Sequence, residues 1–159
     1  MKSICLLNTS LNSNKNFRGS IKALQPIELL YIYEIFKKNY KVDIFDMAFY
    51  SKMPLEIETT DLFIISSSPN YLFWRCPPLN FDFLWQTIFS IKSINKHANI
   101  LLIGPHGQLA REIFFDQGVD YILIGEPELV IESYVDNIFW GKASNYIYAP
   151  DCDMDKLPF

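Results

Sequence analysis

The chain has 159 residues, half of them apolar and 16% aromatic, which indicates one folded globular domain and excludes a disordered chain. Its longest apolar runs, such as 62–65 and 100–103, are too short to cross a bilayer, and no signal peptide is visible, so we expect a cytoplasmic protein. The net charge is −4 with no basic stripe, which argues against nucleic-acid binding.

Three cysteines are scattered along the chain as Cys5, Cys76 and Cys152. An odd number without CxxC spacing argues against both a disulfide framework and a local metal cluster. We therefore expect reduced thiols, with Cys5 buried in the first strand because its neighbours are apolar.

Short apolar runs alternate with amphipathic segments, which predicts a parallel sheet covered by helices. The first strand, 3–7, precedes a long polar stretch and a helix from Pro26, whose apolar stripe is expected at Ile27, Leu30, Tyr31 and Ile35. In chain order, the later strands are expected at 41–46, 61–65, 100–103 and 119–124, and the later helices at 81–94, 108–117 and 127–139.

The second predicted helix, 81–94, has apolar residues at helical spacing, so they are expected to face the core. They are Phe81, Leu84, Trp85, Ile88 and Ile91. The five strands should order as 2-1-3-4-5, with helices on both faces. Residues 1–141 form this domain, and 142–159 are an acidic extension in which 146–148 could add a short strand.

Polar and glycine-rich clusters follow four of the predicted strands. In a parallel sheet these positions meet at one edge, where ligands bind at the point of reversal in strand order. Turn geometry and capping explain each cluster singly, but four on one edge favour a ligand site. The first cluster begins with Asn8 and Thr9, and the second consists of Ser66, Ser67 and Ser68. The third consists of Gly104, Pro105, His106 and Gly107, and the fourth begins with Gly125 and Glu126.

The chain has neither a GxGxxG dinucleotide fingerprint nor a P-loop, and no acidic pair follows the first strand. Instead, several motifs together resemble the cobalamin-binding N-terminal domain of cobalamin-dependent radical S-adenosylmethionine (SAM) proteins. The resemblance covers nearly the whole chain. Its motifs are 26–31, 38–42, Trp-Arg-Cys-Pro-Pro at 74–78, 104–107, Gly-Glu-Pro-Glu at 125–128, and 155–158.

The resemblance implies a flavodoxin-like Rossmann fold that holds cobalamin at the carboxyl edge of the sheet. It assigns cofactor binding to the four clusters and to Trp74, Arg75 and Cys76, although those three also suit a loop that packs under a helix. Glu126 and Glu128 also suit helix capping. Cys76 is expected to remain an unligated thiol.

The resemblance also has two departures. Classical cobalamin domains carry Asp-x-His-x-x-Gly after the first strand, but this loop has no histidine. His97 precedes the fourth strand and His106 lies in another loop, so we expect no histidine on cobalt, as is common in the family resembled. The CxxxCxxC motif is missing too, so the iron–sulfur cluster and S-adenosylmethionine belong to a separate or missing radical SAM domain.

The sequence therefore favours the cobalamin-binding module of a methyltransferase-like radical SAM enzyme, with no catalysis by this chain alone. Two alternatives stay open. One is a stand-alone cobalamin carrier or sensor, and the other is a degenerate Rossmann-like domain that serves as an interaction surface. The partners expected are cobalamin and a radical SAM domain or protein, without nucleic acid or membrane.

Overall fold

The computed structural model describes residues 1–9, 27–47, 55–67, 81–104 and 106–150. The strands are β1 (Ser3–Asn8), β2 (Lys41–Asp46), β3 (Leu62–Ser66), β4 (Asn99–Ile103), β5 (Tyr121–Ile124) and β6 (Tyr146–Tyr148). The α-helices are α1 (Ile27–Phe36), α2 (Asp82–Ile94), α3 (His106–Leu109), α4 (Arg111–Asp116) and α5 (Ile131–Phe139). Two 3-10 helices, η2 (Leu55–Thr59) and η4 (Pro127–Leu129), complete the described elements.

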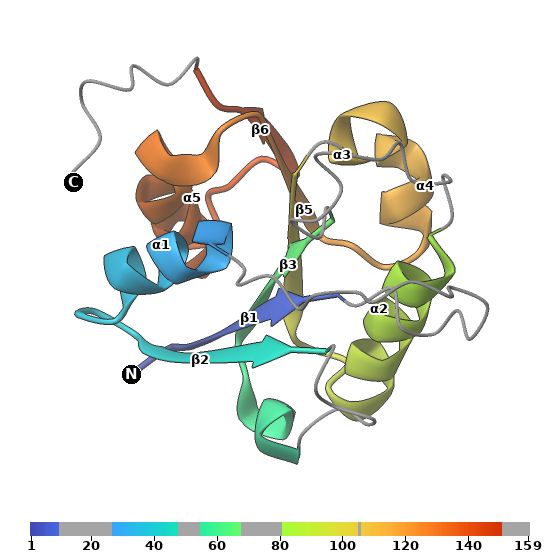
Figure 1. Ribbon diagram of the computed structural model, residues 1–159, viewed down its shortest axis with the longest axis horizontal. Coiled ribbons are helices and arrows are strands. Elements are labelled where there is room, and N and C mark those ends of the chain that lie inside the picture. The colour runs from blue at the N-terminus through green and yellow to red at the C-terminus, as the bar shows by residue number, and fades with distance from the viewer. Residues whose placement is uncertain (10–26, 48–54, 68–80, 105, 151–159) are drawn as a thin grey trace, which may run out of the picture.

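The strands form one sheet in the order β2-β1-β3-β4-β5-β6, with every pair parallel. This confirms the predicted order of the first five strands. The sixth strand adds to the β5 edge, within the segment expected to be an extension (Figure 1).

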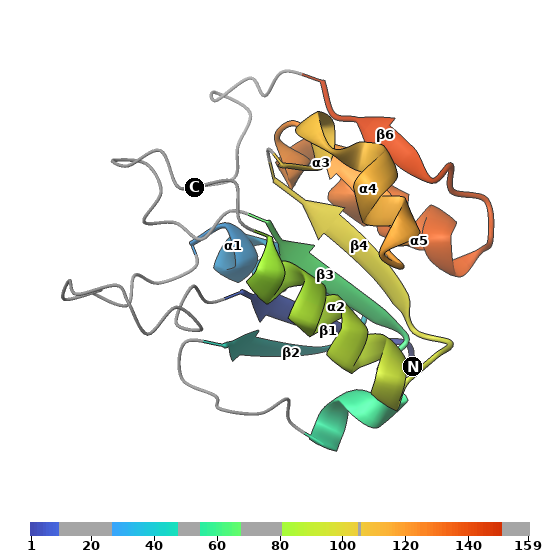
Figure 2. The same cartoon turned by 90° about the vertical axis from the view of Figure 1, so that its right-hand side faces the viewer.

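Helices cover both faces of the sheet, and each face has its own hydrophobic core. Leu84, Ile88 and Ile91 of α2 and Phe114 of α4 pack on one face, while α1 and α5 pack on the other. Figure 2 shows α2, α3 and α4 together on the near side of the strands. Because side chains alternate along a strand, Cys5 points to the first core and Leu6 to the second.

The central strands are buried on both faces, as their continuous apolar runs predict. Cys5 is only 1% exposed, which confirms its predicted burial, and burial raises the pKa of its thiol. Cys76 and Cys152 lie outside the described residues. Among the residues that the structure describes, no helix is long and apolar enough to span a membrane.

The predicted face of α1 is confirmed only in part, because Ile35 packs against the core but Ile27 and Leu30 are exposed, whereas the predicted face of α2 is confirmed. The helix buries Leu29, Ile32 and Phe36, and leaves Ile27 at 72% and Leu30 at 41% exposure. The α1 sequence is apolar on nearly every side, so its periodicity does not select a face. In α2 polar residues separate the apolar positions, and Leu84, Ile88 and Ile91 are buried with Phe81 and Trp85 packed beside them.

Two predicted helices are interrupted. The expected helix at 108–117 begins at His106 and breaks at Ala110, which separates α3 from α4. The expected helix at 127–139 begins at Pro127, as predicted, but Val130 lies between η4 and α5. Both Ala110 (φ −137°, ψ 34°) and Val130 (φ −123°, ψ −15°) depart from helical dihedral angles, so each separates two helical segments.

Phe114 provides a test of the first core. It is completely buried, with its ring centroid 5.3 Å from that of Phe81 and 4.9 Å from that of Trp85. We expect Phe114→Ala to lower the free energy of unfolding by about 3 to 5 kcal/mol, because it removes buried apolar surface and leaves a cavity. Phe89→Ala is the control, since Phe89 is 74% exposed, and it should change the free energy of unfolding by less than about 0.5 kcal/mol. Urea denaturation measures both, and equal losses would contradict this core assignment.

Candidate functional site

The predicted ligand edge lies where β1, β3, β4 and β5 end. Strand order reverses there between β1 and β3, because α1 and α2 cross to opposite faces of the sheet. Parallel register places Asn8 beside Ser66, and Ser66 beside Ile103. We call the described residues at this edge the rim: Asn8, Thr9, Ser66, Ser67, Gly104, His106, Gly107, Gly125 and Glu126. Ser68, Trp74, Arg75, Cys76 and Pro105 lie outside the described residues.

The floor of the rim consists of buried polar residues at the ends of β1 and β3. Thr9 is fully buried and its hydroxyl donates a 3.0 Å hydrogen bond to the Ser66 carbonyl oxygen. Asn8 is 9% exposed and Ser66 3%. These residues tie the two strands together at the point where strand order reverses.

Ser67 connects the end of β3 to α3. Its backbone N–H donates to the Ile103 carbonyl oxygen over 2.9 Å, and its hydroxyl oxygen lies 3.4 Å from Nδ1 of His106. The His106 ring packs edge-on against Phe81, with 5.2 Å between the ring centroids. Burial lowers the pKa of His106, although a hydrogen bond with the Ser67 backbone opposes the shift, so the neutral imidazole is favoured.

Two rim glycines have close neighbours that explain why glycine stands there. A Cβ on Gly107 would lie 2.6 Å from Cγ2 of Ile122, so its absence lets α3 pack closely on β5. Gly125 has φ +94°, and a Cβ there would lie 3.3 Å from the Ala149 carbonyl oxygen. Gly107 is buried beneath the rim, whereas Gly125 and Glu126 are exposed.

Sequence reasoning missed a group of carboxylates at this edge. Glu28 in α1 accepts a 3.1 Å hydrogen bond from the Ser66 hydroxyl, and the charges of Glu126 and Glu128 act on it. Burial first, and these two charges second, raise the pKa of Glu28, while the Ser66 hydrogen bond opposes the rise. Burial likewise raises the pKa of Glu128, whose Oε2 atom is buried and has no hydrogen-bond partner among the residues that the structure describes. The sequence did carry a signal for this group, because Glu28 and Glu128 lie in the first turns of two helical segments. A favourable interaction with the helix start accounts for each residue by itself, however.

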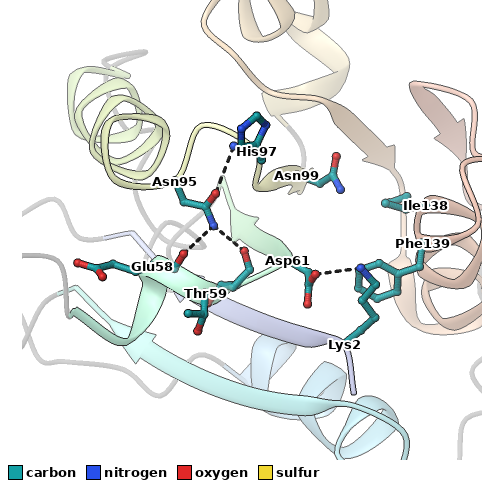
Figure 3. A pocket seen from close by; sticks show the side chains of 10 residues that line it. Lys2, Glu58, Thr59, Asp61, Asn95, His97, Asn99, Ile138 and Phe139 are labelled. Atoms are coloured by element: carbon teal, nitrogen blue, oxygen red, sulfur yellow. Dashed lines mark hydrogen bonds and ion pairs between the residues drawn. The ribbon is translucent and has the colours of Figure 1, made fainter.

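A separate polar depression of about 360 Å³ lies at the opposite, amino edge of the sheet (Figure 3). It is lined partly by His97, which agrees with the prediction that His97 lies at the wrong end for the rim. Lys2 pairs with Asp61 over 2.9 Å, and the Asn95 amide donates to the carbonyl oxygens of Glu58 and Thr60. These bonds join chain segments to each other. We therefore interpret the depression as a surface between the first residues of the strands that the ion pair and hydrogen bonds stabilise.

Glu126 and the turn at Gly125 are exposed at the rim, whereas the hydroxyls of Thr9, Ser66 and Ser67 are buried and engage other protein groups. Among the described residues, no group of three or more histidine, cysteine or acidic residues is arranged to hold a metal ion. An exposed carboxylate and turn backbone are groups that form hydrogen bonds to polar organic ligands.

No protein-family model matches the chain, and comparison with the curated proteins finds no match either. Solved structures do match. TsrM from Kitasatospora setae, a radical S-adenosylmethionine methyltransferase solved with its tryptophan substrate, gives a TM-score of 0.64 at 14% identity and covers 91% of this chain. A second TsrM structure, with cobalamin and a [4Fe-4S] cluster bound, gives 0.62 at 12% identity over the same share.

OxsB, a cobalamin-dependent S-adenosylmethionine radical enzyme solved with aqua-cobalamin, gives a TM-score of 0.54 at 14% identity and also covers 91% of this chain. The match spans 27% of the first TsrM chain, 26% of the second and 19% of the OxsB chain. This chain therefore corresponds to about a quarter or less of each enzyme. At these identities the likeness establishes the fold.

Fold and rim together define a parallel α/β domain of the Rossmann-like class, with flavodoxin-like strand order and a polar edge at the reversal point. Within that class, the chain is structurally similar to portions of cobalamin-dependent radical SAM enzymes.

The raised pKa of Glu28 gives a pH-dependent prediction. Because its pKa is higher in the folded than in the unfolded chain, the ionised carboxylate lowers stability at neutral pH. Glu28→Gln keeps an acceptor for Ser66 and should raise the melting temperature at pH 7 by a few degrees. The gain should disappear as pH falls below the ordinary glutamate pKa, where the wild-type side chain is protonated in both states.

Glu34→Gln is the matched control on the same helix, because the Glu34 side chain is 63% exposed. It should change the free energy of unfolding by less than about 0.5 kcal/mol. Thermal denaturation of both variants between pH 4 and pH 8 makes the comparison (about the range over which a carboxyl of raised pKa titrates). A pH-independent effect of Glu28→Gln would contradict the argument.

Proposed function

We propose that this chain is the cobalamin-binding module of a radical S-adenosylmethionine enzyme of the methyltransferase type. The observation that carries the proposal is the polar rim at the strand-order reversal of a domain whose fold matches portions of TsrM and OxsB. Structures of both enzymes hold cobalamin. The corrin is proposed to lie across the rim at the carboxyl ends of β1, β3, β4 and β5.

The described residues fit such a ligand. A corrin is a broad disc with amide arms, and amide N–H groups require acceptors when they leave water. Within the described part of the chain, Glu128 Oε2 is a buried acceptor with no hydrogen-bond partner, and Glu126, two residues before it, is exposed. The exposed turn at Gly125 lets backbone approach the disc without a side chain in the way. When bound, cobalamin supplies the cobalt centre that carries a methyl group.

No histidine is proposed as a cobalt ligand. His97 lines the depression at the amino edge, away from the rim. His106 is at the rim, but its ring packs on Phe81 and its Nδ1 atom faces the Ser67 hydroxyl. We propose that His106 supports the turn after β4.

The chain is proposed to act with a radical SAM domain or protein, which supplies the iron–sulfur cluster and S-adenosylmethionine. Cys5 is buried within the sheet and unsuited to iron. The chain alone is then a binding module without catalysis. Its proposed location is the cytoplasm, where thiols stay reduced.

Two matched variants test the position of the corrin. Glu126 at the rim and Glu58 at the amino edge are both exposed glutamates. In titrations with hydroxocobalamin followed by absorbance, Glu126→Trp should weaken binding by at least about tenfold, because the indole occupies space proposed for the disc. Glu58→Trp should bind as the wild type does. Equal binding by the two variants would place the ligand elsewhere, and no binding by the folded wild type would refute the proposal.

A histidine-free chain tests the cobalt ligation. The sequence contains only two histidines, so His97→Ala combined with His106→Ala removes both. The absorbance spectrum of bound hydroxocobalamin should be the same for this variant and the wild type, since an axial imidazole would alter it. A spectral shift that persists in the single His106→Ala variant, in which His97 is restored, would show that His106 binds cobalt.

A further inference from the structure

We infer that Ala149 is a positioning residue for the rim turn formed by Gly125 and Glu126, and that it links this turn to the chain segment leaving β6. The inference rests on the proposed function, because it assigns the turn a part in holding cobalamin. It adds that the rim is held in shape from outside the five-stranded core.

The first observation is that β6 brackets β5 at both ends. The Ile122 N–H donates to the Asn145 carbonyl oxygen over 2.8 Å, and the Ala149 N–H donates to the Ile124 carbonyl oxygen over 2.7 Å. Between these bonds the two strands pair in parallel, with Ile124 beside Tyr148 (Figure 1). Ala149 is thus fixed at the residue that immediately precedes the rim turn.

The second observation is the contact between Ala149 and Gly125. A Cβ on Gly125 would lie 3.3 Å from the Ala149 carbonyl oxygen and 3.4 Å from the Ala149 Cβ. Gly125 also has φ +94°, a conformation that side chains rarely adopt. The turn therefore lies directly against Ala149, and its backbone path depends on the space that Ala149 leaves.

The far side of the turn is anchored separately. Glu126 is extended, with φ −77° and ψ 114°, and leads into the buried Pro127 of η4. The Val130 N–H donates to the Pro127 carbonyl oxygen over 3.0 Å, which closes η4. With η4 fixed, a displacement of Ala149 is taken up by the two residues between them, Gly125 and Glu126.

The segment before β6 is attached to a different element. The backbone N–H groups of Lys142 and Ala143 donate to the Asn137 carbonyl oxygen over 2.8 and 3.2 Å, and the Tyr134 hydroxyl donates to the Ser144 carbonyl oxygen over 2.6 Å. These bonds join it to α5. Ala143 is a partly buried alanine of the same connection, and it packs against the core formed with α1 and α5.

The hydrogen bond from Ala149 to Ile124 and the contact between Ala149 and Gly125 join the rim turn to the described residues that follow β6. A displacement of Ala149 would therefore move Gly125 and Glu126, and cobalamin affinity is expected to respond to the position of this segment.

Hydrogen–deuterium exchange of the intact chain tests the link without cobalamin. Ala149→Leu enlarges the side chain that faces Gly125 and should speed amide exchange in a peptide covering 122–128. Ala143→Leu is the control and should leave that peptide unchanged. No change in the Ala149 variant, or an equal change in both, would overturn the inference.

Titration with hydroxocobalamin tests the effect on the site. Ala149→Leu should weaken binding by about tenfold, whereas Ala143→Leu should not, because only the first disturbs the preformed turn. If Ala149→Leu does not fold, Gly125→Ala replaces it and Gly118→Ala is its control. Gly118 has φ +98° too, but its nearest contact lies at 3.7 Å, away from the rim.

The two proposals fail in different ways. Absence of binding by the folded wild type refutes the proposed function, and the inference falls with it. Wild-type binding that is unchanged in the Ala149 and Gly125 variants overturns the inference alone.

Discussion

Strand β1 is hydrogen-bonded along its length to β2 on one side and β3 on the other, and Asn8 at its end pairs with both Asp46 and Ser66. This central position sends the chain out to α1 on one face and, after β3, to α2 on the other. The crossing of these connections to opposite faces creates the reversal point between β1 and β3, the position at which ligands bind in folds of this class. The position of the proposed site thus follows from strand order before any side chain is considered.

The buried strands make that edge rigid. Leu62 to Ile65 and Ile100 to Ile103 are completely buried, so the strand ends cannot shift without disturbing both cores. Thr9 adds a hydrogen bond across the reversal point, from its hydroxyl to the Ser66 carbonyl oxygen. Side chains supplied from outside the strands, such as Glu28 and His106, are then held against a fixed floor.

The rim divides into supports and exposed groups. Thr9, Ser66 and Ser67 are buried and hydrogen-bonded within the protein, so they hold neighbouring turns in place. Gly125 and Glu126 are exposed, and the buried Oε2 atom of Glu128 lies close to them in the chain. In the proposed function, recognition of cobalamin falls to this second group, while the first group determines the shape.

The sequence by itself determined the strands and the polar clusters that follow them, because continuous apolar runs and the turns that end them are local properties of the chain. The strand order, and with it the edge at which the clusters meet, was predicted from the general rule for parallel α/β folds. It did not determine which face of α1 is buried, since apolar side chains surround that helix and only its packing on the sheet selects Leu29, Ile32 and Phe36. Nor did it reveal that Glu28 and Glu128 belong to one cluster of interacting carboxylates, or that Ala149 contacts Gly125. The members of each pair are distant in sequence. They come together only in the tertiary structure, in which the strands take this order and β6 pairs with β5.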